Sequence, residues 1–246
     1  MNHRTVLSLV LTALLALTAC SSHGTEAAPP RHLTSEEADR MALARFTAYR
    51  RGTGEVTATV PSHGRTITLS GRIDWRGHHG YAELRDDAAP PTRELVHWST
   101  HGVASRPRWT GGLPDLPPAS GWEVHPLQPH SAALDSMLLL LLHLGSDRPD
   151  NAQLLARSDA RWLRDDRIDG VPVMVAAGPG APGAPAGSGR LGNTRYWIDA
   201  DGRLLRFQAR LGGEAQWANA ELHRTPSTKP LPDPPAQLTG AGSQDR

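Results

Sequence analysis

The sequence contains a single cysteine, Cys20, and almost no excess of charge of either sign. Without a second cysteine no disulfide can form within the chain, so the folded part must be stabilised by its hydrophobic core. The formal charge of +1 comes from 26 basic and 25 acidic residues. A chain with charges so evenly balanced lacks the basic surface of nucleic-acid-binding proteins, and we expect no nucleic-acid partner.

The common catalytic motifs are also missing. The sequence contains no Gly-x-Ser-x-Gly, no His-Glu-x-x-His and no phosphate-binding glycine loop, so we expect neither catalytic residues nor a cofactor. The segment Asp199–Gly202 has its glycine at the fourth position, whereas a calcium loop has it at the sixth, and we interpret the segment as a turn. His78, His79, His97 and His101 lack a nearby cysteine or carboxylate pattern. We therefore expect these histidines to be solvated and predict no metal site.

Residues 1–19 have the features of an export signal. His3 and Arg4 precede the apolar run Val6–Leu17, and Leu17-Thr18-Ala19-Cys20 follows it directly. These four residues resemble the lipobox of bacterial lipoprotein precursors. The resemblance implies a diacylglyceryl group joined to the Cys20 sulfur by a thioether, cleavage before Cys20 and anchoring at the outer face of the cell membrane, which two or more acyl chains make stable. The alternative is an ordinary signal peptide whose cysteine is incidental.

Composition divides the rest of the chain into three parts. Residues 20–32 are small, polar and proline-containing, which is typical of a flexible tether. Residues 33–224 are expected to form one β-rich domain, since such domains run to about 200–250 residues. Residues 225–246 are rich in proline, and we expect them to be disordered and dispensable for folding. The glycine- and proline-rich segment 178–189 predicts a mobile loop within the domain.

The segment Ser131–Gly145 predicts a helix that is apolar nearly all the way round. Ser131 can cap its start and Gly145 its end. One face carries Leu134, Met137, Leu138, Leu141 and Leu142, and further leucines cover most of the rest. Such a helix must be enclosed, but about 13 residues span only roughly 20 Å, too little for a membrane core of about 30 Å. The helix is therefore part of a plain hydrophobic core or one wall of a ligand-lined hollow.

Most of the remaining domain predicts antiparallel strands. Thr34-Ser35-Glu36-Glu37 is a capping box that opens a helix through about Arg50. Arg65–Trp75 alternates strictly between apolar and polar residues, as a strand with one buried and one wet face does. Glycine-containing turns at residues 100–102 and 200–202 predict hairpins. The sequence thus predicts an α+β fold, an antiparallel curved sheet or half-barrel with helices packed in its concave face.

Two stretches add a resemblance to a known family. Ala160-Arg161-Trp162-Leu163 leading to Asp169-Gly170-Val171-Pro172-Val173, and then the segment Tyr196–Leu204, are similar to the LolA/LppX/LprG-like extracytoplasmic lipoproteins of actinobacteria. The resemblance covers roughly residues 33–224 and rests on turns and strand ends. It implies an antiparallel half-barrel that holds acyl chains of lipids or lipoproteins between sheet and helices, and it offers no catalytic residue.

The apolar stripe of the leucine-rich helix and the strands that should face it define the predicted binding site. We expect nine residues to line the ligand: Leu134, Met137, Leu138, Leu141, Ile67, Leu69, Ile73, Leu205 and Phe207. The predicted function is that of a membrane-anchored carrier or chaperone that binds a lipid or another apolar small molecule. The alternative is a protein-interaction or envelope-stress-sensing lipoprotein on the same fold, with a filled core and another envelope protein as its partner. We expect no enzymatic activity in either case.

Overall fold

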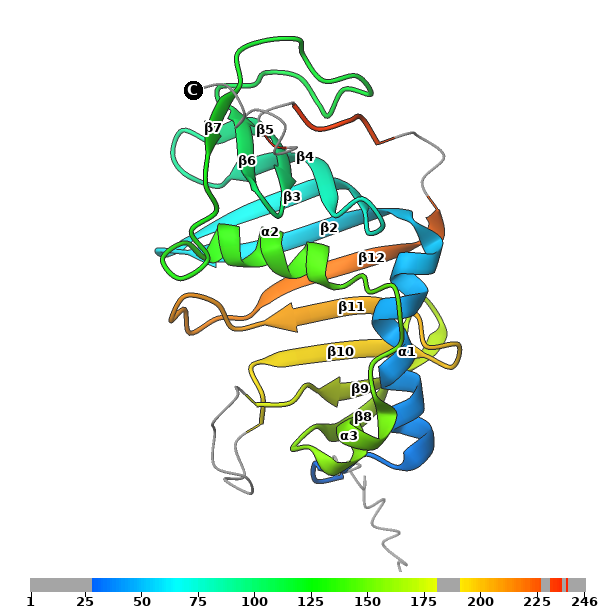
Figure 1. Ribbon diagram of the computed structural model, residues 1–246. Coiled ribbons are helices and arrows are strands. Elements are labelled where there is room, and N and C mark those ends of the chain that lie inside the picture. The colour runs from blue at the N-terminus through cyan, green and yellow to red at the C-terminus, as the bar shows by residue number, and fades with distance from the viewer. Residues whose placement is uncertain (1–27, 181–190, 227–230, 236–237, 239–246) are drawn as a thin grey trace, which may run out of the picture.

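The computed structural model describes residues 28–180, 191–226, 231–235 and 238 (Figure 1). The predicted signal peptide and Cys20 lie outside the described residues, as do residues 181–190 of the predicted loop and most of the predicted tail. Within the described part of the chain, no helix is long and apolar enough to span a bilayer.

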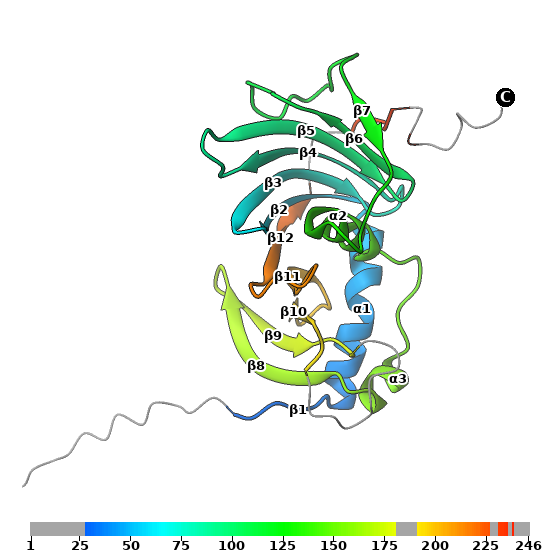
Figure 2. The same ribbon diagram turned by 90° about the vertical axis from the view of Figure 1, so that its left-hand side faces the viewer.

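In these ranges twelve antiparallel strands form one open sheet, and with three helices they make an α+β fold. Across the sheet the strands are β1 (Arg31–His32), β8 (Arg161–Ile168), β9 (Val171–Ala177), β10 (Thr194–Asp199), β11 (Leu204–Ala209), β12 (Ala218–Pro226), β2 (Thr53–Ser62), β3 (Arg65–Asp74), β4 (His79–Asp86), β5 (Thr92–Ser99), β6 (Gly102–Arg106) and β7 (Glu123–His125). The helices are α1 (Ser35–Arg51), α2 (Ala133–His143) and α3 (Ala152–Arg157). The sheet curves strongly from one edge to the other (Figure 2).

The strand order joins two meanders, β8–β12 and β2–β7, through the pairing of β12 with β2. The helix α1 makes this order possible because it leads from β1 at one edge to β2 in the middle of the sheet (Figure 1). Its 17 residues give a length of roughly 25 Å. That length is comparable with the six strand spacings, each of about 4.8 Å, that separate β1 from β2.

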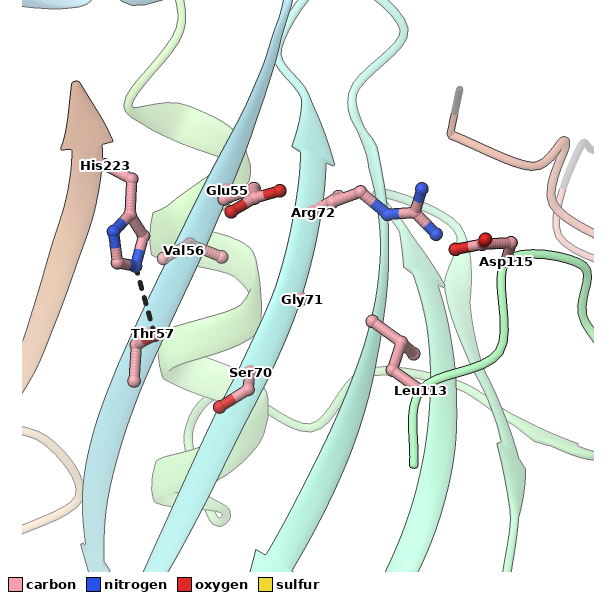
Figure 3. A pocket seen from close by; sticks show the side chains of 9 residues that line it. All are labelled: Glu55, Val56, Thr57, Ser70, Gly71, Arg72, Leu113, Asp115 and His223. Carbon is pink, nitrogen blue, oxygen red and sulfur yellow. Dashed lines mark hydrogen bonds between the residues drawn. The ribbon is translucent and has the colours of Figure 1, made fainter. Parts of the chain in front are cut away.

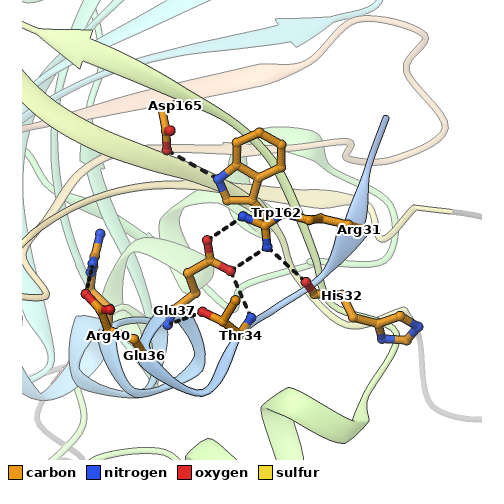
Figure 4. A network of polar contacts seen from close by, with 8 residues as sticks. All are labelled: Arg31, His32, Thr34, Glu36, Glu37, Arg40, Trp162 and Asp165. Atoms are coloured by element: carbon orange, nitrogen blue, oxygen red, sulfur yellow. Dashed lines mark hydrogen bonds and ion pairs between the residues drawn. The ribbon is translucent and has the colours of Figure 1, made fainter. Parts of the chain in front are cut away.

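The start of α1 is fixed by a polar network that also holds β1 in the sheet (Figure 4). The capping box is confirmed, with reciprocal bonds between Thr34 and Glu37. The Arg31 guanidinium donates to both carboxylate oxygens of Glu37 at 2.7 Å and lies 4.4 Å from the ring centroid of Trp162. These hydrogen bonds from Arg31 lower the pKa of Glu37 to about 2. Arg31 and His32, predicted as the end of a flexible tether, therefore form an edge strand paired with β8.

The leucine-rich segment forms α2, which packs against β2, β3 and β5. Two tryptophans of the sheet fix its position, since the indole N–H of Trp75 donates to the Leu141 carbonyl at 3.0 Å and that of Trp98 to Leu138 at 3.1 Å. The predicted cap is wrong. The helix begins after Ala132, while the Ser131 hydroxyl turns back to the Gln128 carbonyl.

The predicted tail is not wholly separate from the fold. Leu238 is buried, with 1% of its surface exposed. Its carbonyl accepts a hydrogen bond from the Ser99 hydroxyl at 3.0 Å, at the end of β5, and its side chain lies against Gly102. Leu238, within the predicted disordered tail, therefore contacts the sheet, and whether residues 225–246 are dispensable for folding stays a prediction.

Candidate functional site

The hollow that the sequence predicts beside α2 is filled. Six of the nine predicted lining residues have at most 1% of their surface exposed: Leu69, Ile73, Met137, Leu138, Leu141 and Phe207. Ile67 and Leu134 are partly buried and pack against the same hydrophobic cluster. A void that could admit an acyl chain would leave accessible surface on the side chains around it. These residues therefore form a close-packed core, which is the plainer of the two interpretations open from sequence.

Leu205 is not part of that cluster. It lies with Val173, Val175 and Trp197 in a second, smaller cluster, whereas Phe207 belongs to the main core. The cause is a β-bulge: the register between β10 and β11 shifts after Trp197, so that Ile198 pairs with Leu204. A bulge reverses the in-and-out alternation of the strand. The expectation that Leu205 and Phe207 share one face is therefore wrong.

An open apolar pocket of about 360 Å³ lies elsewhere, between α1, α3 and β10. Its apolar lining comes from Met41 and Ala44 of α1, Leu154 and Leu155 of α3, and Pro179 after β9. Met41 and Ala44 are buried, with 6% and 2% of their surface exposed, so Leu154, Leu155 and Pro179 supply most of the accessible apolar surface. Leu154 has 66% of its surface exposed. A concave, largely apolar surface with a few polar groups at its edge has the composition of a small-molecule site.

One side of this pocket is polar. Arg45 of α1 donates from Nη1 to Asp150 at 3.0 Å and from Nε to the His143 carbonyl at 2.8 Å. Asp150 is itself placed by its backbone N–H, which donates to the Ala42 carbonyl at 3.0 Å. The arrangement ties the segment between α2 and α3 to α1, so that the ion pair faces the pocket at a fixed position.

Tyr196, Asn151 and Ser158 complete the polar lining. The Tyr196 ring meets Phe207 edge to face, with centroids 5.2 Å apart, and burial raises the pKa of its hydroxyl. The hydroxyl is therefore neutral at physiological pH and can both donate and accept a hydrogen bond. The Asn151 side-chain oxygen accepts from the Leu154 N–H at 3.0 Å and caps α3. Sequence reasoning missed this site, although the cap before two adjacent leucines is a local signal for an exposed apolar turn.

Two other pockets are more polar. One of about 270 Å³, drawn in Figure 3, lies over β12, β2 and β3, with Glu55, Arg72, Asp115 and His223 among its lining residues. The other, of about 460 Å³, lies between the segments Pro117–Val124 and Asp233–Pro235. Charges of both signs line the first, and the second combines Ser120, Asp233 and backbone groups with proline, tryptophan and valine side chains. Neither offers the continuous apolar surface of the pocket beside α3.

The prediction of solvated histidines is wrong for His97. Its ring has 0% exposure, stacks on Tyr81 with centroids 4.5 Å apart and meets the edge of Trp122 at 5.5 Å. Burial, and then the neighbouring His79, lowers the pKa of His97 to about 4. Among the described residues no group of three or more His, Cys, Asp or Glu side chains could hold a metal ion.

Comparisons with known proteins do not assign the chain to a family. A scan against models of known protein families finds no match, and a search of curated proteins finds no significant relative.

Proposed function

We propose that this protein is a membrane-anchored extracytoplasmic lipoprotein that binds a lipid or another apolar molecule in the pocket between α1, α3 and β10. The observation that carries the proposal is the pocket itself, about 360 Å³ in volume, to which α1, α3 and Pro179 contribute apolar side chains. Ligand sites in proteins commonly have volumes of about 300–1,000 Å³ and a mainly apolar lining. Each methylene group that a ligand buries there contributes about 0.8 kcal/mol.

The proposed fold is a half-barrel of the LolA/LppX/LprG type, with its helices on the concave side of the sheet. The curvature of the sheet and the position of α2 beside it support this view (Figure 2). In this chain the space next to α2 is occupied by the core. The ligand would instead lie beside α1 and α3, nearer to the β1 edge of the sheet.

The position of the pocket suits a ligand taken from a membrane. The described chain begins at Ala28, just before β1, and α3 lies at the same end of the sheet as β1 and β8 (Figures 1 and 2). The chain from Cys20 to Ala28 can span at most roughly 30 Å when fully extended. An acyl anchor on Cys20 would therefore keep this end of the sheet close to the bilayer surface.

The proposal is tested by filling the pocket. Leu155 lines it and is partly buried, so Leu155→Trp should place a ring in the space and weaken binding of a fluorescent acyl probe by about tenfold or more, a change of ~1.4 kcal/mol. Leu116→Trp is the matched control, because Leu116 is 80% exposed and lies outside the pocket. A parent protein that binds no acyl probe, or equal binding by the parent and Leu155→Trp, would refute the proposal.

The filled core favours a second candidate, the protein-interaction lipoprotein. The edge strand β7 is exposed at all three of its residues, Glu123, Val124 and His125, and such an edge can pair with a strand of another protein. A photo-crosslinker at position 124 that captures one defined envelope protein, together with the absence of acyl-probe binding, would favour this candidate over the first.

A further inference from the structure

We propose that the ligand of this pocket is a single-chain amphiphile with a neutral, hydrogen-bonding head group, and that the Arg45–Asp150 pair discriminates against free carboxylates. The inference rests on the proposed function and names the class of ligand. A monoacylglycerol has this chemistry: one acyl chain, an ester carbonyl and two hydroxyls. A fatty acid of the same chain length is the class that the pocket should bind less well.

The size of the pocket limits the number of chains. At about 360 Å³ it is near the lower end of the range for small-molecule sites, which is about 300–1,000 Å³. The core next to α2 offers no extension, because Met137, Leu138 and Leu141 are completely buried. One acyl chain along Leu154, Leu155 and Pro179, the pocket residues with accessible apolar surface, fits this space better than two or three chains do.

The charge on the polar side of the pocket cancels. Arg45 and Asp150 are the charged residues in its lining, and their side chains face each other at 3.0 Å with about a third of each exposed (36% and 35%). A second carboxylate, Asp159, accepts a hydrogen bond from the Gly180 N–H at 2.9 Å, next to Pro179 of the lining. A ligand carboxylate would have to share Arg45 with Asp150 and would meet repulsion from it.

A neutral head group can use both members of the pair without separating them. A guanidinium has five N–H donors and a carboxylate has about four acceptor positions, so one contact between them leaves capacity on each. Arg45 can donate to an ester carbonyl while Asp150 accepts from a hydroxyl. The neutral hydroxyl of Tyr196, which also lines the pocket, can take part in the same set of bonds.

The test compares 1-monooleoylglycerol with oleate, which share the same acyl chain, by displacement of a fluorescent acyl probe below the aggregation limit of each lipid. The protein is the chain from residue 20 onward with Cys20→Ala, at about pH 8, where a carboxyl with an ordinary pKa is ionised. We expect the parent to bind the monoacylglycerol about tenfold more tightly than oleate, a difference of ~1.4 kcal/mol.

Two reciprocal variants assign the preference to the ion pair. Asp150→Asn leaves Arg45 without its counter-charge, so oleate should gain affinity and the preference should disappear or reverse. Arg45→Gln removes the positive charge and leaves the Asp150 carboxylate, so it should weaken oleate more than it weakens the monoacylglycerol, and the preference for the neutral lipid should widen. Asp147→Asn is the matched control on the same segment, since Asp147 is 71% exposed and pairs with Arg148 at 3.7 Å outside the pocket.

The possible outcomes separate this inference from the function on which it rests. Equal or tighter binding of oleate by the parent would overturn the inference and leave apolar binding standing. An unchanged ratio of the two affinities in Asp150→Asn and Arg45→Gln, with melting curves that show both variants folded, would also overturn it. If Asp150→Asn does not fold, Arg45→Gln decides alone. Binding of neither lipid by the parent would overturn the proposed function, and the inference with it.

Discussion

His97 is a residue whose protonation should affect stability directly. Its ring is enclosed by Tyr81 and Trp122 and lies in a cross-strand row that includes Arg72, with His79 also nearby. A proton on this ring would place a charge in a buried site, and repulsion from the neighbouring His79 adds a smaller cost. The folded protein therefore keeps His97 neutral, with a pKa of about 4 instead of its ordinary 6.5.

The shift predicts how stability changes with pH. Because the unfolded chain binds this proton more readily, the stabilisation is complete above about pH 6.5 and is lost progressively as the pH falls towards 4, by roughly 3 kcal/mol in total. Urea unfolding near neutral pH and again at about pH 4.5 measures the loss. His97→Phe retains the stacking but cannot be protonated, so its stability should fall less over the same interval. An identical loss in both proteins would show that His97 does not titrate in this way.

Among the secondary-structure elements, α2 and α3 have different roles. From the sequence, the leucines of α2 could belong either to a hydrophobic core or to the wall of a ligand site. In the structure four residues of this helix have 0% of their surface exposed: Met137, Leu138, Leu141 and Leu142. The helix therefore stabilises the β2–β5 part of the sheet. The candidate site depends on the much shorter α3, in which no residue is buried.

A close-packed α2 predicts a large effect of truncation. Leu141→Ala should destabilise the fold by about 2–5 kcal/mol, since a fully buried leucine leaves a cavity that the neighbours only partly fill. Leu139→Ala, on the partly exposed side of the same helix, should cause a smaller loss. Chemical denaturation of the two variants measures the difference. A loss under about 1 kcal/mol for Leu141→Ala would mean that a void already exists beside the helix.

Patterns among residues close together in the sequence predicted most helices and strands. Features that depend on pairing between distant segments could not be predicted in this way. The capping box at Thr34 and the strand pattern of Arg65–Trp75 depend on neighbours a few residues apart, and the structure has the capping box in α1 and the strand as β3. The expectation of one wet face is wrong at Arg72, which has 3% of its surface exposed. The bulge that turns Leu205 away from Phe207 depends on the partner strand β10, which periodicity within β11 does not reveal.

The candidate site shows the same limit. Arg45 and Asp150 are far apart in the sequence and meet only because α1 crosses the sheet next to α3. The pairing of Arg31–His32 with β8 and the docking of Leu238 at Gly102 are likewise tertiary contacts. Composition alone therefore placed these segments outside the domain.

At the scale of the whole molecule, the proposed anchor determines where the pocket operates. If Cys20 is acylated, replacing it with Ala should move the protein from the detergent phase to the aqueous phase in phase partitioning, or leave an unprocessed precursor. The physical reason is that two or more acyl chains give stable anchoring, and no helix in the described residues can replace them. A Cys20→Ala protein that is still cleaved before residue 20 and partitions with detergent would contradict the lipoprotein proposal.

The most direct test of the central claim is the mass of the intact folded protein after it has been exposed to lipid. The chain from residue 20 onward with Cys20→Ala is incubated with vesicles that contain a monoacylglycerol, separated from them and measured by native mass spectrometry. We predict one bound single-chain lipid per protein molecule, and loss of that lipid in Leu155→Trp, whose ring fills the pocket between α1, α3 and β10. A parent protein that carries no lipid, or a Leu155→Trp variant that carries as much as the parent, would contradict the claim.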